Sequence, residues 1–271
     1  MYKIIAIDID GTLLNDTHEI TPAVRDSIKA AKAKGVKVVL CTGRPLAGIK
    51  KSLIELDLLD EGDYAITFNG AVVLETASEK TLADITLNKT ELEEIYAFCH
   101  AENVNVTYFD GKNMYVPSRK ITEITCQDSL LLGTPLYHLP VEEAPESIHV
   151  SKVMLLDSPE KNYRCDKKNY QRISKKKFYV VRSVPYNLEF LQKGVNKGSA
   201  LASLADKIGV DQSEVMSIGD QENDITMIEY AGMGVAMGNA TEHIKEIANY
   251  TTTTNNEDGV AQAIQMLILD R

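Results

Sequence analysis

Residues 3–12 read KIIAIDIDGT, an apolar run that ends in two aspartates and a glycine. The part from Lys3 to Ile9 is rich in β-branched residues, which predicts a strand that is buried on both faces. Strands of this kind occur in parallel sheets that carry helices on both sides. Gly11 permits a sharp turn directly after the strand. The stretch therefore predicts an α/β fold in which Asp8 and Asp10 lie where the first strand ends.

The first and last thirds of the chain alternate between strand and helix patterns. Thr21 and Pro22 are typical of a helix start, Gly35 of a helix end, and Asn69-Gly70 of a turn after a strand. The alternation implies right-handed crossovers and a Rossmann-like, doubly wound parallel sheet. The predicted strands are 3–9, 36–41, 64–68, 215–218, 235–237 and 250–253, and the predicted helices are 22–35, 45–56, 197–208 and 224–230.

The middle of the chain has a different character, with more aromatic residues and longer charged helical stretches. Helices are expected at 90–102 and 159–173, and strands at 104–109, 150–156 and 178–182. We interpret residues 85–189 as an inserted second domain, and residues 1–84 and 190–271 as the two parts of one core domain.

Composition and charge limit the classes of function. The chain has 271 residues, 44% of them hydrophobic, and a net charge of −10, which disfavours binding to nucleic acids or anionic membranes. Its apolar runs are far shorter than the ~20 residues that a membrane-spanning helix needs. Asp8 and Asp10 interrupt the apolar start, so no signal peptide is expected. Four widely spaced cysteines without a CxxC pair suit reduced thiols, and we expect a cytoplasmic protein.

Asp8 and Asp10 are the first candidate site. Residues two apart on a strand project to the same side, and ligands of open parallel sheets bind beyond the carboxyl ends of the strands. Two carboxylates about 4 Å apart repel by roughly 4 kcal/mol at an effective dielectric of about 20, so the pair favours a bound cation. Oxygen ligands alone indicate Mg²⁺ rather than Zn²⁺. The alternative is a pair of solvated loop aspartates.

Two further candidates lie at predicted helix starts. Thr42-Gly43-Arg44-Pro45 follows the second strand, and its hydroxyl and open N–H groups can seat an anion, although an ordinary helix cap has the same pattern. Lys197 begins a helix, where the macrodipole disfavours a cation by a few tenths to about 1 kcal/mol. An anion in front of Lys197 would explain its position, and a solvated lysine is the alternative.

The fourth candidate is Gly219-Asp220-Gln221-Glu222-Asn223-Asp224, between a buried strand and a helix. Asp220 is placed as a metal ligand, Asn223 as a helix cap or phosphate ligand, and Asp224 as support for either. An acidic helix N-terminus is favoured electrostatically even without a ligand. All four candidates fall at strand carboxyl ends or the adjoining helix starts, so they share one rim and together predict a site.

These motifs resemble, in order, the four motifs of the haloacid dehalogenase superfamily of phosphotransferases. Asp8-Ile9-Asp10-Gly11-Thr12-Leu13-Leu14 resembles the first, Thr42-Gly43-Arg44 the second, Lys197 the third and residues 219–224 the fourth. The inserted domain is similar to the α/β cap of the Cof-type (class IIB) branch, and Phe68-Asn69-Gly70-Ala71 resembles the turn before that cap. Residues 218–259 are similar to YidA-type bacterial sugar phosphatases.

The resemblance implies a role for each residue. Asp8 would attack phosphorus to form an aspartyl-phosphate, and Asp10 would act as general acid and then as general base. Mg²⁺ would bind the carboxylates of Asp8 and Asp220 and the backbone carbonyl of Asp10. The predicted phosphate-binding residues are Thr42, Gly43, Lys197 and Asn223, and the predicted supporting residues are Arg44 and Asp224.

The predicted function is a Mg²⁺-dependent phosphatase that acts on small phosphorylated metabolites such as sugar phosphates. A phosphosugar mutase with the same aspartate pair is the alternative within enzymes. A module that is phosphorylated on Asp8 without turnover is the alternative outside them, and an intact Asp10 argues against it because general acid–base catalysis hastens loss of the phosphoryl group. The sequence makes no prediction of oligomeric state.

Overall fold

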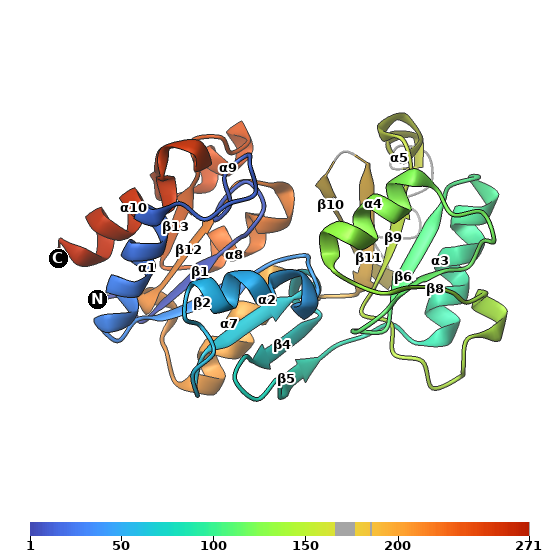
Figure 1. Ribbon diagram of the computed structural model, residues 1–271, viewed down its shortest axis with the longest axis horizontal. Helices are drawn as coiled ribbons and strands as arrows, with labels where there is room; N and C mark the ends of the chain where they lie inside the picture. The colour runs from blue at the N-terminus through green and yellow to red at the C-terminus, as the bar shows by residue number, and fades with distance from the viewer. Residues whose placement is uncertain (166–176, 185, 271) are drawn as a thin grey trace. The chain divides into compact units, whose positions relative to one another are not determined.

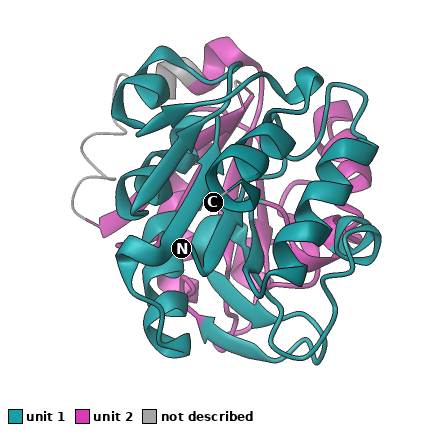
Figure 2. Cartoon of the chain, turned by 90° about the vertical axis from the view of Figure 1, so that its left-hand side faces the viewer, with its two compact units in different colours: residues 1–43, 50–83, 196–271 teal, residues 44–49, 84–195 magenta. Residues whose placement is uncertain are grey.

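The computed structural model describes residues 1–165, 177–184 and 186–270, which fall into two compact units. Unit 1 comprises Met1–Gly43, Lys50–Ala83 and Asn196–Arg271, and unit 2 comprises Arg44–Ile49 and Asp84–Val195 (Figure 2). Unit 1 is therefore built from two distant parts of the sequence, with most of unit 2 between them.

Unit 1 holds a sheet in the order β14-β13-β12-β1-β2-β3-β4-β5, formed by residues that the structure describes (Figure 1). β1 lies inside this sheet and pairs in parallel with β12 and β2. The strands are β1 (Ile4–Ile7), β2 (Lys37–Cys41), β3 (Tyr64–Thr67), β4 (Val72–Glu75), β5 (Thr81–Asp84), β12 (Val215–Gly219), β13 (Met233–Ala236) and β14 (Tyr250–Thr251). The buried, β-branched run at the start of the chain thus forms an interior strand, as its composition predicts.

One edge of this sheet departs from the parallel pattern. β4 pairs antiparallel with β3, and β5 extends the sheet beyond it. These two strands are not among the predicted ones, because they follow a tight turn and β5 exposes every residue at least in part. An antiparallel edge needs only a short turn, whereas each parallel pair needs a crossover helix.

The helices of the first and last thirds are α1 (Pro22–Ala33), α2 (Leu46–Glu55), α7 (Lys197–Ile208), α8 (Ile225–Tyr230), α9 (Glu242–Ile247) and α10 (Gly259–Ile264). The predicted cap of α1 is present, since Thr21 accepts a hydrogen bond from the N–H of Val24. Side chains of β1 alternate between the faces of the sheet, and Ile4 packs in the same cluster as Leu201 of α7. The α/β fold with a largely parallel sheet is confirmed.

Unit 2 holds a second sheet of described residues, in the order β10-β11-β9-β6-β7-β8. Its pairs are antiparallel except for β7 and β8, which are parallel. Its elements are α3 (Lys89–Ala101), β6 (Val106–Phe109), β7 (Met114–Val116), α4 (Glu123–Leu132), β8 (Leu136–His138), β9 (Lys152–Leu156), α5 (Pro159–Cys165), β10 (Phe178–Val184) and β11 (Asn187–Gln192). The helix predicted at 159–173 begins as α5, and its part from 166 onward lies outside the described residues.

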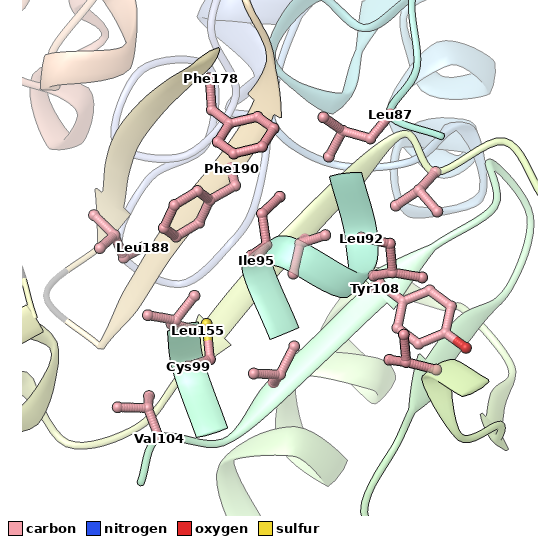
Figure 3. Close-up of a cluster of buried hydrophobic side chains, with 14 residues drawn as sticks. Leu87, Leu92, Ile95, Cys99, Val104, Tyr108, Leu155, Phe178, Leu188 and Phe190 are labelled. Carbon is pink, nitrogen blue, oxygen red and sulfur yellow. The ribbon is translucent and has the colours of Figure 1, made fainter. Parts of the chain in front are cut away.

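The core of unit 2 lies between α3 and one face of this sheet (Figure 3). Leu92, Ile95 and Cys99 recur at helical spacing on α3 and are fully buried against the sheet, where Phe190 of β11 contributes to the cluster. The other face of the sheet carries polar residues as well, because the buried Lys152 forms an ion pair there with Glu189 at 3.0 Å. The sheet of unit 2 is therefore apolar on one face and partly polar on the other.

Within the described part of the chain, no helix combines the length and apolar character that crossing a bilayer would require.

Candidate active site

Asp8 lies where β1 ends, inside the sheet of unit 1. Its backbone N–H donates to the carbonyl of Ile218 at 3.0 Å, which continues the pairing of β1 with β12 for one more residue. The side chain is buried, with 4% of its surface exposed. The interior strand β1 thus holds the carboxylate of Asp8 in place at the carboxyl end of the strand, where the sequence predicts it.

Lys197 is the first residue of α7, and its ammonium group faces two carboxylates. Asn196 caps the helix by accepting from the N–H of Ser199 at 2.8 Å. Nζ of Lys197 lies 2.5 Å from Oδ1 of Asp8 and 2.5 Å from Oδ1 of Asp224. Two buried aspartates thus face the ammonium group at the helix start, and the phosphate-binding role of Lys197 stays a prediction.

The turn after β12 is organised by the second carboxylate oxygen of Asp224. That oxygen, Oδ2, accepts from the backbone N–H groups of Asp220 at 2.9 Å and Gln221 at 3.0 Å. Asp220 in turn accepts from the hydroxyl of Thr12 at 2.9 Å and from Nε2 of Gln221 at 3.2 Å. Asp224 thus connects Lys197 to the backbone that carries Asp220.

Gly11 allows the loop after β1 to approach Asp220. Its φ is +78°, and a Cβ at this position would lie 2.5 Å from Oδ2 of Asp220. A side chain would therefore be strained in conformation and would collide with a carboxylate of the cluster. Both constraints agree with the turn that the sequence predicts at this glycine.

The buried acids of the cluster are strongly perturbed. Burial, together with the charges of Asp224, Asp220 and Asp10, raises the pKa of Asp8 well above its usual value, and Lys197 opposes the shift. Burial and the charge of Asp224 raise the pKa of Asp220 to about 7, against hydrogen bonds from Thr12 and Gln221. Burial lowers the pKa of Lys197, but Asp224 and Asp8 outweigh it and the net shift is upward. One lysine does not balance these carboxylates.

The cluster has the composition of a site for a divalent cation. Ligand oxygens of Asp8, Asp220 and Asp224 lie within 4.8 Å of one another, and all three residues are buried. Oxygen-only donors suit Mg²⁺ or Ca²⁺ rather than Zn²⁺. Oδ1 of Asp8 accepts from Lys197, and both oxygens of Asp220 and of Asp224 accept hydrogen bonds, so these bonds do not single out two of the three as ligands. The residues present therefore fit the metal that the sequence predicts.

The predicted phosphate-binding residues Thr42, Gly43 and Asn223 also lie in unit 1. Thr42 is buried directly after β2, and its N–H donates to the carbonyl of Ile66 at 2.9 Å. Asn223 is buried after β12, and its Nδ2 donates to Oδ1 of Asn69 at 3.1 Å. Asn69 in turn lies against Gly43, because a Cβ at Gly43 would be 3.0 Å from Nδ2 of Asn69. The second and fourth motifs are thus linked through Asn69.

Neither Asp10 nor Arg44 belongs to the group of three buried carboxylates. Asp10 is half-buried and lies outside the group of three carboxylates, although its charge acts on Asp8. Its predicted roles as acid–base group and as carbonyl ligand stay predictions. Arg44 groups with unit 2, and its Nη1 donates to the carbonyl of Gly48 at 3.3 Å.

The predicted site residues do not include Thr12, Gln221 or Asn69. Thr12 and Gln221 hold the carboxylate of Asp220, and Asn69 holds the amide of Asn223. Thr12 and Gln221 stand inside the predicted motifs, so their proximity could have been anticipated. Asn69 was interpreted only as part of a turn, and its side-chain role depends on contacts across 154 residues of sequence.

The chain is similar to known proteins along nearly its whole length. A family model for haloacid dehalogenase-like hydrolases matches residues 5–264. YxeH of Bacillus subtilis is 45% identical over 269 residues, which cover 99% of each chain. The 5-amino-6-(5-phospho-D-ribitylamino)uracil phosphatase YcsE of the same species is 34% identical over 268 residues, covering 98% of this chain and 96% of that one.

A solved structure of a subclass IIB sugar phosphatase of the same superfamily has a TM-score of 0.84 at 29% identity. The match covers 97% of this chain and 98% of the other, so it includes both units. The chain therefore belongs to the haloacid dehalogenase-like hydrolase family, and it is a phosphoric monoester hydrolase of that family.

Proposed function

We propose that this phosphatase is Mg²⁺-dependent and hydrolyses small sugar or sugar-alcohol phosphates through a phosphoryl group carried on Asp8. The observation that carries the proposal is the buried contact of Asp8 with Lys197, beside Asp220 and Asp224. A fixed, ion-paired carboxylate at the end of an interior strand is suited to in-line attack on phosphorus. The sugar class is supported by the similarity to a sugar phosphatase and to a phosphatase of a ribityl phosphate.

The first chemical step uses Asp8 and Asp10. A carboxylate oxygen of Asp8 forms a bond to phosphorus while the bond from phosphorus to the ester oxygen breaks. Asp10 gives its proton to the leaving alkoxide, which departs as the alcohol. Lys197 favours the ionised form of Asp8, which is the form that attacks. The products of this step are the free alcohol and phosphorylated Asp8.

The second step returns the enzyme to its starting state. A water molecule loses a proton to Asp10 as its oxygen attacks the phosphorus, and the bond to Asp8 breaks. Inorganic phosphate leaves, and Asp10 is protonated for the next cycle. In both steps the remaining phosphate oxygens are held by Thr42, Gly43, Lys197 and Asn223. A bound Mg²⁺ supplies charge that screens the nucleophile from the phosphate dianion.

The test is release of inorganic phosphate from a panel of sugar phosphates, sugar bisphosphates, sugar-alcohol phosphates, pyridoxal phosphate and p-nitrophenyl phosphate. Each substrate is assayed with Mg²⁺ and with EDTA, using wild type, Asp8→Asn and Asp26→Asn. Asp26 is an exposed aspartate on α1 and serves as the matched control. We expect Mg²⁺-dependent release that is greatest for the sugar and sugar-alcohol phosphates, abolished in Asp8→Asn and unchanged in Asp26→Asn.

Substantial residual activity in Asp8→Asn would overturn the mechanism. Preference for pyridoxal phosphate would overturn the substrate class and leave the mechanism standing. A requirement for a hexose bisphosphate, with the phosphoryl group kept on the sugar, would instead identify a mutase. A stable phosphoryl group on Asp8 without released phosphate would identify a sensing module.

A further inference from the structure

The turn between β3 and β4 has an unusual backbone. Phe68, Asn69 and Gly70 have φ values of +50°, +53° and +102° in succession. Left-handed conformations are uncommon for residues other than glycine, and a bulky residue such as phenylalanine rarely adopts them. Each strained residue costs on the order of 1–3 kcal/mol and persists only where the surroundings hold it in place. The turn is therefore held by its neighbours, and these belong to the candidate site.

Backbone contacts tie the turn to two of the four motifs. The N–H of Asn69 donates to the carbonyl of Thr42 at 2.9 Å. Gly70 lies against the residue before Lys197, because a Cβ at Gly70 would be only 2.3 Å from the carbonyl oxygen of Asn196. The turn is thus fixed from the second motif on one side and from the third on the other.

The side chain of Asn69 reaches the fourth motif. Oδ1 of Asn69 accepts from Nδ2 of Asn223 at 3.1 Å, and the two residues are 1% and 7% exposed. Oδ1 of Asn223 is buried and accepts no hydrogen bond from any group in the described part of the chain. An amide nitrogen carries two N–H groups, so this bond occupies only one of them.

This bond selects one orientation of the Asn223 amide. Rotating the amide by half a turn would bring its oxygen against Oδ1 of Asn69, and two acceptors facing each other in a buried site are repelled. In the observed orientation the second N–H of Asn223 remains for a phosphate oxygen. In the reversed orientation the amide oxygen would take over part of that space and repel the phosphate.

We propose that Asn69 is a positioning residue that fixes the Asn223 amide with its second N–H directed at the substrate phosphate. The proposal rests on the proposed phosphate-binding role of Asn223 and adds to it the group that sets its geometry. Asn69 does not itself touch the reacting atoms. Its contribution is preorganisation, since the donor is already oriented when the phosphate arrives.

The experiment is a double-mutant cycle on phosphate affinity. Asn69→Gly, Asn223→Ala and the double variant are compared with wild type by the inhibition constant for inorganic phosphate, with Mg²⁺ present. Glycine adopts the φ of +53° without strain, so Asn69→Gly removes the side chain and keeps the turn. Asn103→Gly replaces an exposed asparagine with a φ of +54° in unit 2 and serves as the matched control.

We expect Asn223→Ala and Asn69→Gly each to weaken phosphate binding about three- to tenfold, the range of one net hydrogen bond. The double variant should be no weaker than Asn223→Ala, because Asn69 acts only through that residue. Asn103→Gly should bind phosphate as wild type does. In NMR spectra, the side-chain amide signal of Asn223 should move in Asn69→Gly and stay hydrogen-bonded in Asn69→Asp, which keeps an acceptor oxygen.

The outcomes separate this inference from the proposed function. Weakened binding in Asn223→Ala with unchanged binding in Asn69→Gly would overturn the inference alone. If the losses of phosphate affinity in the two single variants multiplied in the double variant, the inference would also be overturned, because Asn69 would then act by another route. Unchanged phosphate affinity in Asn223→Ala would overturn the phosphate seat, and the inference with it.

Discussion

Nζ of Lys197 lies 2.5 Å from Oδ1 of Asp8, although 189 residues of sequence separate the two. Both side chains are buried, and Asp224 completes the contact from a third segment. A buried ion pair of this kind contributes little net stability, but removing one partner leaves an uncompensated charge. The same three residues therefore bear on folding and on the candidate chemistry, and substitutions can separate the two effects.

Lys197→Met is expected to destabilise the protein by about 3–5 kcal/mol, because Asp8 and Asp224 would remain buried without their cation. Adding Asp224→Asn should recover part of that stability and none of the activity, since one of the two carboxylates that face Lys197 becomes neutral. Denaturant unfolding and phosphate release measure the two effects. Lys207→Met, an exposed position on the same helix, should change the free energy of unfolding by less than about 0.5 kcal/mol. If Lys197→Met alone were as stable as wild type, the buried contact of Lys197 with Asp8 and Asp224 would be contradicted.

Asp10→Ala should reduce turnover most for substrates with poor leaving groups. A sugar alkoxide needs a proton as it departs, whereas p-nitrophenolate leaves readily without one. We expect the loss in kcat on a sugar phosphate to exceed the loss on p-nitrophenyl phosphate by on the order of 10²-fold, the lower end of what acid–base catalysis contributes. Equal losses on both substrates would show that Asp10 is not the proton donor.

Gly11→Ala should raise the Mg²⁺ concentration needed for half-maximal activity, because its Cβ would press on the carboxylate of Asp220 at 2.5 Å. Gly35→Ala is the matched control. Its φ is +84°, and no atom lies within 4 Å of its added Cβ, so it carries the backbone strain without the collision. Both variants should lose roughly 1–2 kcal/mol of stability from the left-handed backbone. A similar Mg²⁺ requirement in the two variants would refute the steric role of Gly11.

Metal removal should destabilise the protein through repulsion among Asp8, Asp220 and Asp224. With Mg²⁺ at a hundred times its dissociation constant, the gain in stability should be about 2.7 kcal/mol. Asp220→Asn should be more stable than wild type in EDTA, because one buried negative charge is gone, and Mg²⁺ should stabilise it less. Thermal unfolding with Mg²⁺ and with EDTA measures this, and Asp206→Asn on the surface of α7 is the control. An Asp220→Asn variant that responds to Mg²⁺ as wild type does would exclude Asp220 as a ligand.

Much of the core fold could be predicted because its signals are local. β1 is an uninterrupted apolar run, β2 is apolar after Lys37, and β12 is apolar except for Ser217. α7 carries a cap at Asn196 and ends before Gly209, which has a left-handed conformation. Tertiary packing therefore agrees with the local strand and helix preferences of these segments. The four motifs could be placed for the same reason, since each directly follows one of these strands or begins a helix.

β11 and α4 could not be predicted, because long-range contacts decide them. β11 contains Asn187 and Glu189, polar residues that read as a loop until Lys152 is known to neutralise Glu189 across the sheet. α4 exposes Leu130 and Leu131, so its apolar residues do not mark a buried stripe. The role of Asn69 was equally hidden, since its partner Asn223 lies at the far end of the sequence.

The interleaving of the two units governs the order in which this protein is completed during synthesis. Residues 84–195 leave the ribosome as one uninterrupted block with its own apolar core, before α7 or β12 exists. Until then β1 has β2 on one side and an unpaired edge on the other, and Asp8 is without its lysine. The edge of β1 stays open to mispairing while the insert is translated, and residues after 195 then close the sheet and complete the charge cluster.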